Sequence, residues 1–291
     1  MGLAGAGPLI DVHAHFYYDG CARADWRALN AARIRAGRAI GITCHVASIL
    51  GSWGRSSPIY FQSPADTVTA NDAMLALQRE HGTLIRSYVA VNPNDIDGAL
   101  TEIERCVSLG AAGVKLAAAR RADDPLVEPI AAYAASHGLP ILHHVWQHRR
   151  RFWTGQDASD GLELCRLAAR HPAANVILAH IGGGGDYRHT FAAVRDTPNV
   201  YLDLSGSGVD RGMLDDAIIA VGPDRLLWGA DLTLCTGLAK LWALETIGLS
   251  SDDLADIRWR NAVRIFPPGT FAVAAATPPA PGSARPQRSI A

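Results

Sequence analysis

The chain is best understood outward from one stretch near its start, Leu9-Ile10-Asp11-Val12-His13-Ala14-His15-Phe16. The run is largely apolar, which predicts a β-strand. Side chains alternate between the two faces of a strand, so His13 and His15 point to the same side, about 7 Å apart along the backbone. Two imidazoles placed in this way on a rigid element can hold one metal ion. The pair therefore predicts a metal site at the end of a first strand.

The composition describes a soluble, nearly neutral chain that is large enough for a full core. Its 291 residues are 48% hydrophobic and carry a formal net charge of −1. The balanced charge argues against nucleic acid as a partner, and no apolar run reaches the roughly 20 residues that cross a bilayer. Residues 1–8 lack the features of a signal peptide. The five cysteines are scattered and form no CxxC pair, which favours reduced thiols in a cytoplasmic protein over a cysteine nucleophile.

Short apolar runs alternate with helical patterns along most of the chain. The predicted strands are Leu9–Phe16, Thr43–Leu50, Leu84–Asn92, Gly113–Ala118, Leu139–Val145, Asn175–Ile181, Val200–Ser205 and Leu226–Leu232. Segments between them place apolar residues three and four positions apart, as in Thr69–His81, Ile96–Leu109 and Leu126–His137. This alternation predicts a parallel sheet closed into a single-domain (β/α)8 TIM barrel. An open doubly wound sheet is the alternative, although no GxGxxG motif follows the first strand.

The ends of the chain differ in composition from its middle. Residues 1–8 are rich in Gly and Ala, and residues 277–290 are rich in Pro, Ala, Ser and Arg without a periodic apolar face. We therefore expect a flexible N-terminus over residues 1–8, the barrel over residues 9–268 and a disordered tail over residues 269–291.

Residue types that bind metals close four of the predicted strands. They are His13 and His15 on the first, His143 and His144 on the fifth, His180 on the sixth and Asp231 on the eighth. In barrels of this kind, functional side chains gather at the C-terminal ends of the strands. One such histidine alone would more often be structural, and Asp231 alone could cap a helix. Together they predict a divalent transition metal, with Zn²⁺ ranked before Fe²⁺ and Mn²⁺.

Four phrases of the sequence resemble the amidohydrolase superfamily, and more narrowly its amidohydrolase-2 family, over roughly residues 9–266. The phrases are Gly138-Leu139-Pro140-Ile141-Leu142-His143-His144, Val176-Ile177-Leu178-Ala179-His180-Ile181-Gly182-Gly183, Trp228-Gly229-Ala230-Asp231 and Asn261-Ala262-Val263-Arg264-Ile265-Phe266. The family includes amidohydrolases, lactone hydrolases and non-oxidative decarboxylases related to aminocarboxymuconate semialdehyde decarboxylase.

The resemblance implies a ligand set, which is His13, His15, His144, His180 and Asp231. His144 is preferred to His143 because the family pattern places its histidine four residues after the proline. Strand alternation then turns His143 toward the helix layer.

Lys115 lies on the fourth predicted strand, where burying an amine is costly unless it is paired or modified. In some relatives a carboxylated lysine on this strand bridges two metal ions, so Lys115 is a candidate ligand of a second ion. Pairing with a carboxylate is the alternative. The number of ions, one or two, therefore stays open.

Candidate substrate contacts follow the second and fifth strands. Arg149 could hold a substrate carboxylate through two hydrogen bonds, and Arg55 and Trp146 could line the pocket. Trp53 could add to its apolar wall, and Arg150 and Arg151 fit a solvated surface. His45 and His189 are candidates for groups behind the ligands or at the substrate.

The leading functional hypothesis is a metal-dependent hydrolase that attacks an amide, lactone or ester bond of a small, carboxylate-bearing substrate with an activated water. Asp231 would accept the proton of that water and His180 would orient the oxyanion. The first alternative is a non-oxidative decarboxylase or other C–C lyase on the same site. The second is a non-heme iron oxygenase, with two irons if Lys115 bridges them. Relatives often pair through helices, which makes a homodimer a candidate assembly.

Overall fold

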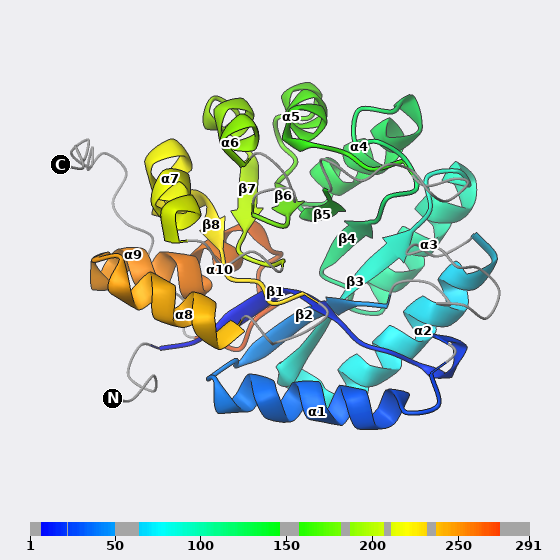
Figure 1. Ribbon diagram of the computed structural model, residues 1–291. Coiled ribbons are helices and arrows are strands. Elements are labelled where there is room, and N and C mark those ends of the chain that lie inside the picture. The colour runs from blue at the N-terminus through cyan, green and yellow to red at the C-terminus, as the bar shows by residue number, and fades with distance from the viewer. Residues whose placement is uncertain are drawn as a thin grey trace.

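The computed structural model describes residues 7–21, 23–49, 64–145, 157–181, 187–206, 211–231 and 237–273. Within this part of the chain, parallel strands form one sheet in the order β1 to β8, with helices arranged around its outside (Figure 1). Of the predicted flexible N-terminus over residues 1–8 and the predicted tail over residues 269–291, residues 1–6 and 274–291 lie outside the described residues. The chain packs against the barrel past residue 268, because the Phe271 and Phe266 rings lie 5.3 Å apart.

All eight predicted strands are present in the predicted order. They are β1 (Ile10–His15), β2 (Cys44–Ser48), β3 (Ile85–Val91), β4 (Gly113–Leu116), β5 (Ile141–His144), β6 (Val176–Ala179), β7 (Val200–Asp203) and β8 (Leu226–Leu227). The sheet closes between β8 and β1, where the Val12 N–H donates to the Trp228 carbonyl at 3.0 Å and the Asp231 N–H donates to the His13 carbonyl at 2.7 Å. The single-domain (β/α)8 TIM barrel is thus confirmed, and the open sheet is wrong.

The helices cover the barrel in chain order. They are α1 (Trp26–Ala39), α2 (Pro64–His81), α3 (Ile96–Ser108), α4 (Glu128–Ser136), α5 (Gly161–Arg170), α6 (Tyr187–Arg195), α7 (Arg211–Val221) and α8 (Gly237–Thr246). Two short helices, α9 (Ser251–Ala255) and α10 (Asn261–Ile265), flank a π-helical turn over Asp256–Arg260. None of the helices described has the length and hydropathy that crossing a membrane requires.

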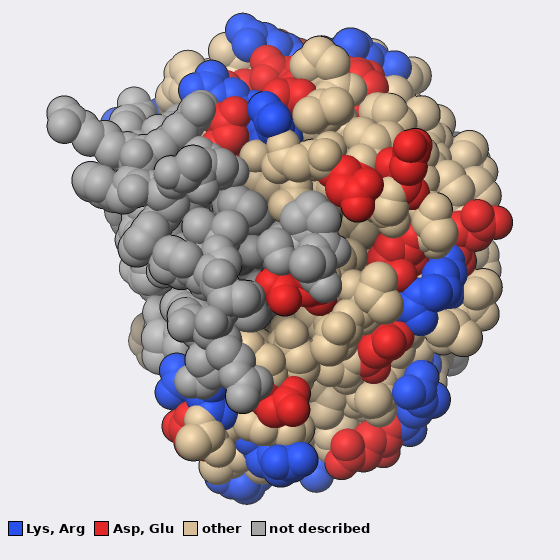
Figure 2. Space-filling view, turned by 90° about the vertical axis from the view of Figure 1, so that its right-hand side faces the viewer, with Lys and Arg blue, Asp and Glu red and all other residues tan. Residues whose placement is uncertain are grey.

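The two faces of the strands form separate apolar cores. Outward-facing side chains such as Val114, Ile141 and Leu178 pack against the helices. Leu142 and Ile177 point inward and fill the barrel. At the surface, Figure 2 shows acidic and basic side chains interspersed over the described part of one face, in keeping with the nearly balanced charge of the chain.

β8 is much shorter than the predicted strand Leu226–Leu232. After Leu227 the backbone no longer pairs with β7. The Trp228 N–H donates to the Ile257 carbonyl at 3.0 Å, and the Ala230 N–H donates to the Asp11 carboxylate at 2.9 Å. The apolar run predicted a strand because it cannot distinguish a buried strand from a buried irregular segment.

β1 contains a bulge that decides which way its polar residues point. Asp11 pairs with His45 of β2, but Ala14 pairs with Ala47, so β1 holds one extra residue between these pairs. In a regular strand Asp11 would share a face with His13. The bulge separates them, so that Asp11 contacts His45 and α1, while His13 points into the barrel.

Candidate metal centre

Five side chains from distant parts of the sequence converge at one end of the barrel. The Nε2 atoms of His13 and His15 lie 3.0 Å apart, and Asp231 Oδ1 lies 3.7 Å and 3.4 Å from them, respectively. Asp231 Oδ2 lies 3.7 Å from His180 Nδ1. His180 Nε2 lies 3.2 Å from His144 Nδ1. The side chains that the sequence analysis proposed as ligands therefore form one connected cluster.

The spacing and chemistry of this cluster fit a divalent transition metal. One ligand atom from each of His13, His180 and Asp231 lies within 4.8 Å of the other two. Neighbouring ligand atoms that hold one ion at about 2.1 Å are themselves about 2.9–3.4 Å apart. The His13–His15 and His144–His180 nitrogen pairs, at 3.0 Å and 3.2 Å, match that spacing. A set of imidazoles with one carboxylate suits Zn²⁺, Mn²⁺ or Fe²⁺.

Unusual backbone conformations turn two of these residues toward the centre. His180 and Asp231 have φ angles of 58° and 57°, and no other non-glycine residue of the described segments has a positive φ. Val176 and Leu178 of β6 face the helices, so an extended His180 would follow them outward. The left-handed turn directs its ring into the mouth of the barrel instead. Such conformations cost about 1–3 kcal/mol each and persist where surrounding contacts enforce them.

Polar groups behind the histidines fix the orientation of their rings. His13 Nδ1 lies 2.8 Å from Asp203 Oδ2 and 2.9 Å from Ser205 Oγ. The same Ser205 hydroxyl lies 2.9 Å from His180 Nδ1. On the other side, His15 Nδ1 lies 3.1 Å from Ser48 Oγ. A carboxylate on His13 Nδ1 keeps the proton there, which leaves the Nε2 lone pair facing the centre.

The sequence analysis did not identify Asp203 and Ser205 as site residues. Both lie at the end of the predicted strand Val200–Ser205. Polar residues that close an apolar strand are a usable signal, and the seventh strand carries it as the first, fifth, sixth and eighth do.

Charges in the cluster favour the protonation states that metal ligands need. Burial, followed by the charge of Lys115, lowers the pKa of His15 to about 3. Burial alone would raise the pKa of Asp231, but the charges of His13 and His180 outweigh it and hold that pKa below its usual range. Burial also lowers the pKa of His13, His144 and His180. Near neutral pH the imidazoles are therefore neutral and the carboxylate is ionised, as metal binding requires.

The chain matches a known protein family over most of its length. Residues 10–267 match the model of the amidohydrolase family known as amidohydrolase-2. The chain belongs to this family. The resemblance seen in the four sequence phrases is thus confirmed, although no curated protein matches the chain by sequence.

Solved structures share the fold of this chain at low sequence identity. A 5-carboxyvanillate decarboxylase from Sphingomonas paucimobilis is 18% identical, with a TM-score of 0.68 over 89% of this chain and 98% of that one. A 2,6-dihydroxybenzoate decarboxylase, solved with 2,6-dihydroxybenzoate, is 18% identical, with a TM-score of 0.68 over 88% and 97% of the two chains. A dihydroxybenzoic acid decarboxylase from Polaromonas sp. JS666, with bound manganese and 2-nitroresorcinol, is 19% identical, with a TM-score of 0.68 over 89% and 96%.

Lys115 is buried and faces the cluster. Its side chain is fully shielded from solvent, and its Nζ lies 3.2 Å from His13 Nε2. Burial lowers the pKa of Lys115 to about 8, against the opposing charges of Asp231 and Asp203. The amine therefore lies where it can act on the centre, and a role as ligand of a second ion stays a prediction.

The two histidines of β5 point in opposite directions. His144 reaches His180, as described above. His143 is fully buried, its Nδ1 lies 2.9 Å from the carbonyl of His144, and its Nε2 has no hydrogen-bond partner among the described residues. This is the arrangement that strand alternation predicts.

The pair provides a matched test of the ligand assignment. His144→Gln is expected to weaken Mn²⁺ binding at least about tenfold, because it removes an imidazole from the cluster. His143→Leu is the control, since it replaces a buried ring that points away. Isothermal titration with Mn²⁺ measures both variants against the parent. Equal weakening by both variants would contradict the assignment.

The remaining predicted site residues divide into two groups. Trp146, Arg149 and Arg55, together with Trp53, Arg150 and Arg151, lie outside the described residues. Of the two other candidate histidines, His189 is exposed on α6, whereas His45 is buried behind β1. His45 thus lies near the ligands without facing them.

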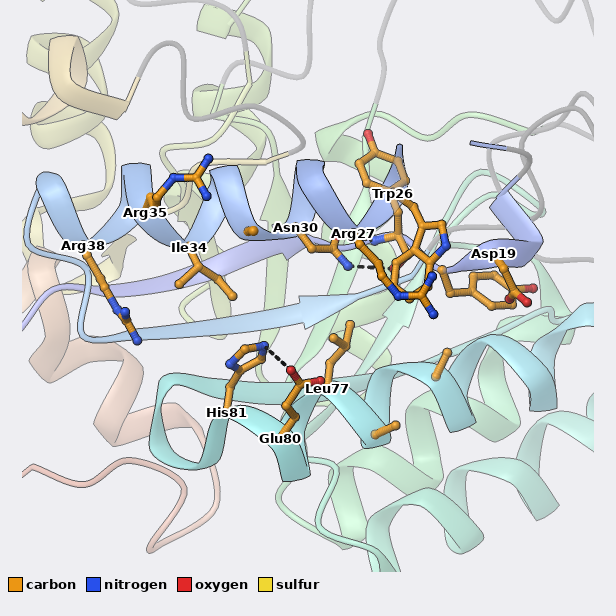
Figure 3. A pocket seen from close by; sticks show the side chains of 15 residues that line it. Asp19, Trp26, Arg27, Asn30, Ile34, Arg35, Arg38, Leu77, Glu80 and His81 are labelled. Carbon is orange, nitrogen blue, oxygen red and sulfur yellow. Dashed lines mark hydrogen bonds and ion pairs between the residues drawn. The ribbon is translucent and has the colours of Figure 1, made fainter. Parts of the chain in front are cut away.

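A separate pocket of about 650 Å³ lies between α1 and α2, on the outside of the barrel (Figure 3). Trp26, Ile34 and Leu77 give it apolar walls, and Arg35 and Arg38 line it from α1. None of the five clustered side chains lines this pocket. It is therefore distinct from the candidate metal centre.

Proposed function

We propose that this protein is a metal-dependent, non-oxidative decarboxylase that releases CO2 from a small carboxylic acid. The dependence on metal is supported by one cluster of side chains at one end of the barrel, which are those of His13, His15, His144, His180 and Asp231. The similar solved structures named above are decarboxylases, and they favour decarboxylation over the hydrolysis that the sequence alone suggested. Manganese in one of them makes Mn²⁺ the first ion to test, before Zn²⁺ and Fe²⁺.

The five clustered side chains would hold the ion. A bound divalent ion would polarise the substrate and anchor its anionic groups. Lys115 contributes positive charge next to His13, which favours an anionic substrate in this mouth. The buried surroundings strengthen that attraction, because they exclude water from between the charges.

Decarboxylation breaks a C–C bond and leaves an electron pair on the carbon that loses CO2, so that carbon must gain a proton. Asp231 and His180 are the pair suited to deliver it, with 3.7 Å between the carboxylate and the ring. Ser205 holds the same ring nitrogen of His180 at 2.9 Å, which limits the rotation of the ring. Because both groups are unprotonated near neutral pH, Asp231 would first take up a proton from water and then pass it to that carbon.

A product assay tests this function. The Mn²⁺-loaded protein is incubated with hydroxybenzoates that carry a carboxylate next to a hydroxyl group, 2,6-dihydroxybenzoate and 5-carboxyvanillate first. We expect CO2 release and, in D2O, one deuterium at the ring carbon that lost CO2. Protein treated with a chelator is the control.

Two other outcomes would contradict decarboxylation. Incorporation of ¹⁸O from water into the product of a lactone, ester or amide, without CO2, would return the assignment to a hydrolase. Consumption of O2 during turnover would indicate an oxygenase.

A further inference from the structure

A second polar network lies on the outer side of β1, behind the metal centre. Its middle is the fully buried carboxylate of Asp11. Asp11 Oδ2 lies 2.8 Å from His45 Nδ1 and accepts a hydrogen bond of 3.1 Å from Arg33 Nη2. Asp11 Oδ1 accepts hydrogen bonds from the backbone N–H groups of Ala230 at 2.9 Å and His13 at 3.2 Å. One carboxylate thus holds the backbone of His13 and of Ala230, the residue that precedes Asp231.

Arg33 connects this network directly to Asp231. The guanidinium extends from α1, and its Nη1 donates a hydrogen bond to the carbonyl oxygen of Asp231. The N–H of Asp231 donates to the His13 carbonyl at 2.7 Å. Both polar backbone groups of Asp231 are therefore held, one by a ligand-bearing strand and one by Arg33.

These contacts account for the strained backbone of Asp231. A residue with a side chain pays to adopt a φ of 57°, and it keeps that conformation only where its neighbours enforce it. The planar fork of an arginine can hold Asp11 with one nitrogen and the Asp231 carbonyl with the other. A lysine has a single ammonium group and no such fork.

Two positions of helix α1 allow this network to pack against it. Arg33 has only 8% of its surface exposed, whereas Arg35 of the same helix is exposed and lines the outer pocket (Figure 3). One turn after Arg33, a Cβ at position 37 would lie 2.7 Å from His45 Nε2. Gly37 therefore leaves room for the His45 ring against the helix.

We propose that Arg33 is a positioning residue of the metal centre. Together with Asp11, it fixes the backbone of Asp231 and of His13, and so sets the directions from which their side chains approach the ion. The inference rests on the metal centre of the proposed function, but it does not depend on which reaction that centre catalyses.

Metal binding tests the proposal without a substrate. Arg33→Lys keeps the charge and removes the fork, and Asp11→Asn keeps the side-chain volume and removes the charge. Arg35→Lys is the matched control on the exposed side of α1. Mn²⁺ affinity is measured from the electron paramagnetic resonance signal of the free ion, and the visible spectrum of Co²⁺-loaded protein reports the ligand geometry. We expect both network variants to bind Mn²⁺ about tenfold more weakly than the control, with an altered Co²⁺ spectrum.

The outcomes separate this inference from the proposed function. A parent protein that binds neither ion would overturn the metal centre itself. If the parent binds Mn²⁺ and both network variants bind it as tightly as Arg35→Lys, with unchanged Co²⁺ spectra, only the positioning role is overturned. A purely structural role would lower the melting temperature of the metal-free variants and leave affinity and spectrum unchanged. Should Arg33→Lys fail to fold by circular dichroism, the result for Asp11→Asn decides.

Discussion

Asp231→Asn is expected to lower turnover by about a thousandfold, the typical contribution of a positioned acid or base. Asparagine has the size of aspartate and keeps one side-chain oxygen for the ion, so the barrel stays folded and the protein is expected to stay loaded when Mn²⁺ is in excess. The amide still lies next to the flanking histidines, which are 3.4–3.7 Å from the Asp231 carboxylate, but it cannot accept and return a proton. The rate of CO2 release measures the loss, while circular dichroism and metal analysis check the fold and the ion content.

An exposed aspartate supplies the control for this variant. Asp252 of α9 has 75% of its side chain exposed and pairs only with Arg260 at the surface among the ion pairs described. Asp252→Asn is expected to keep the parent rate. If Asp231→Asn also kept the parent rate, the role of Asp231 in proton transfer would be excluded.

Removal of the metal with a chelator is expected to abolish turnover and to lower the melting temperature. Without a cation, the ring nitrogens of the His13–His15 and His144–His180 pairs still face each other at 3.0 Å and 3.2 Å, but no ion bridges them. An ion that binds only the folded state, at 100 times its Kd, stabilises that state by about 2.7 kcal/mol. Calorimetry measures the melting temperature, the CO2 assay measures turnover, and metal analysis checks that the ion has been removed.

Adding back metals makes this result specific. Mn²⁺ is expected to restore both turnover and melting temperature, whereas Mg²⁺ should restore neither, because it prefers oxygen ligands to imidazoles. Full turnover in protein shown to be free of metal would contradict a metal-dependent mechanism.

Several features of this protein could be predicted from sequence because each depends on local periodicity or on chain order. Apolar runs repeated eight times between helical patterns specify the barrel, and alternation along a regular strand is enough to separate His143 from His144. Residues that close strands of one parallel sheet lie at one edge of it. For this reason His15, His180 and Asp231 could be grouped although the chain separates them widely.

Other features depended on packing between distant segments. The bulge that separates Asp11 from His13, and the left-handed turns at His180 and Asp231, interrupt the periodicity on which prediction relies. The hydrogen bond from Arg33 to Asp231 joins residues 198 positions apart.

The sequence by itself therefore determined the barrel and the residue types at its mouth, because periodicity and strand order are properties of the chain. Only the tertiary structure decided how those residues are aimed and which groups hold them. That choice follows from contacts between distant segments, such as those of Arg33 with Asp231 and of Ser205 with His13 and His180, and such contacts leave no repeating pattern in the sequence.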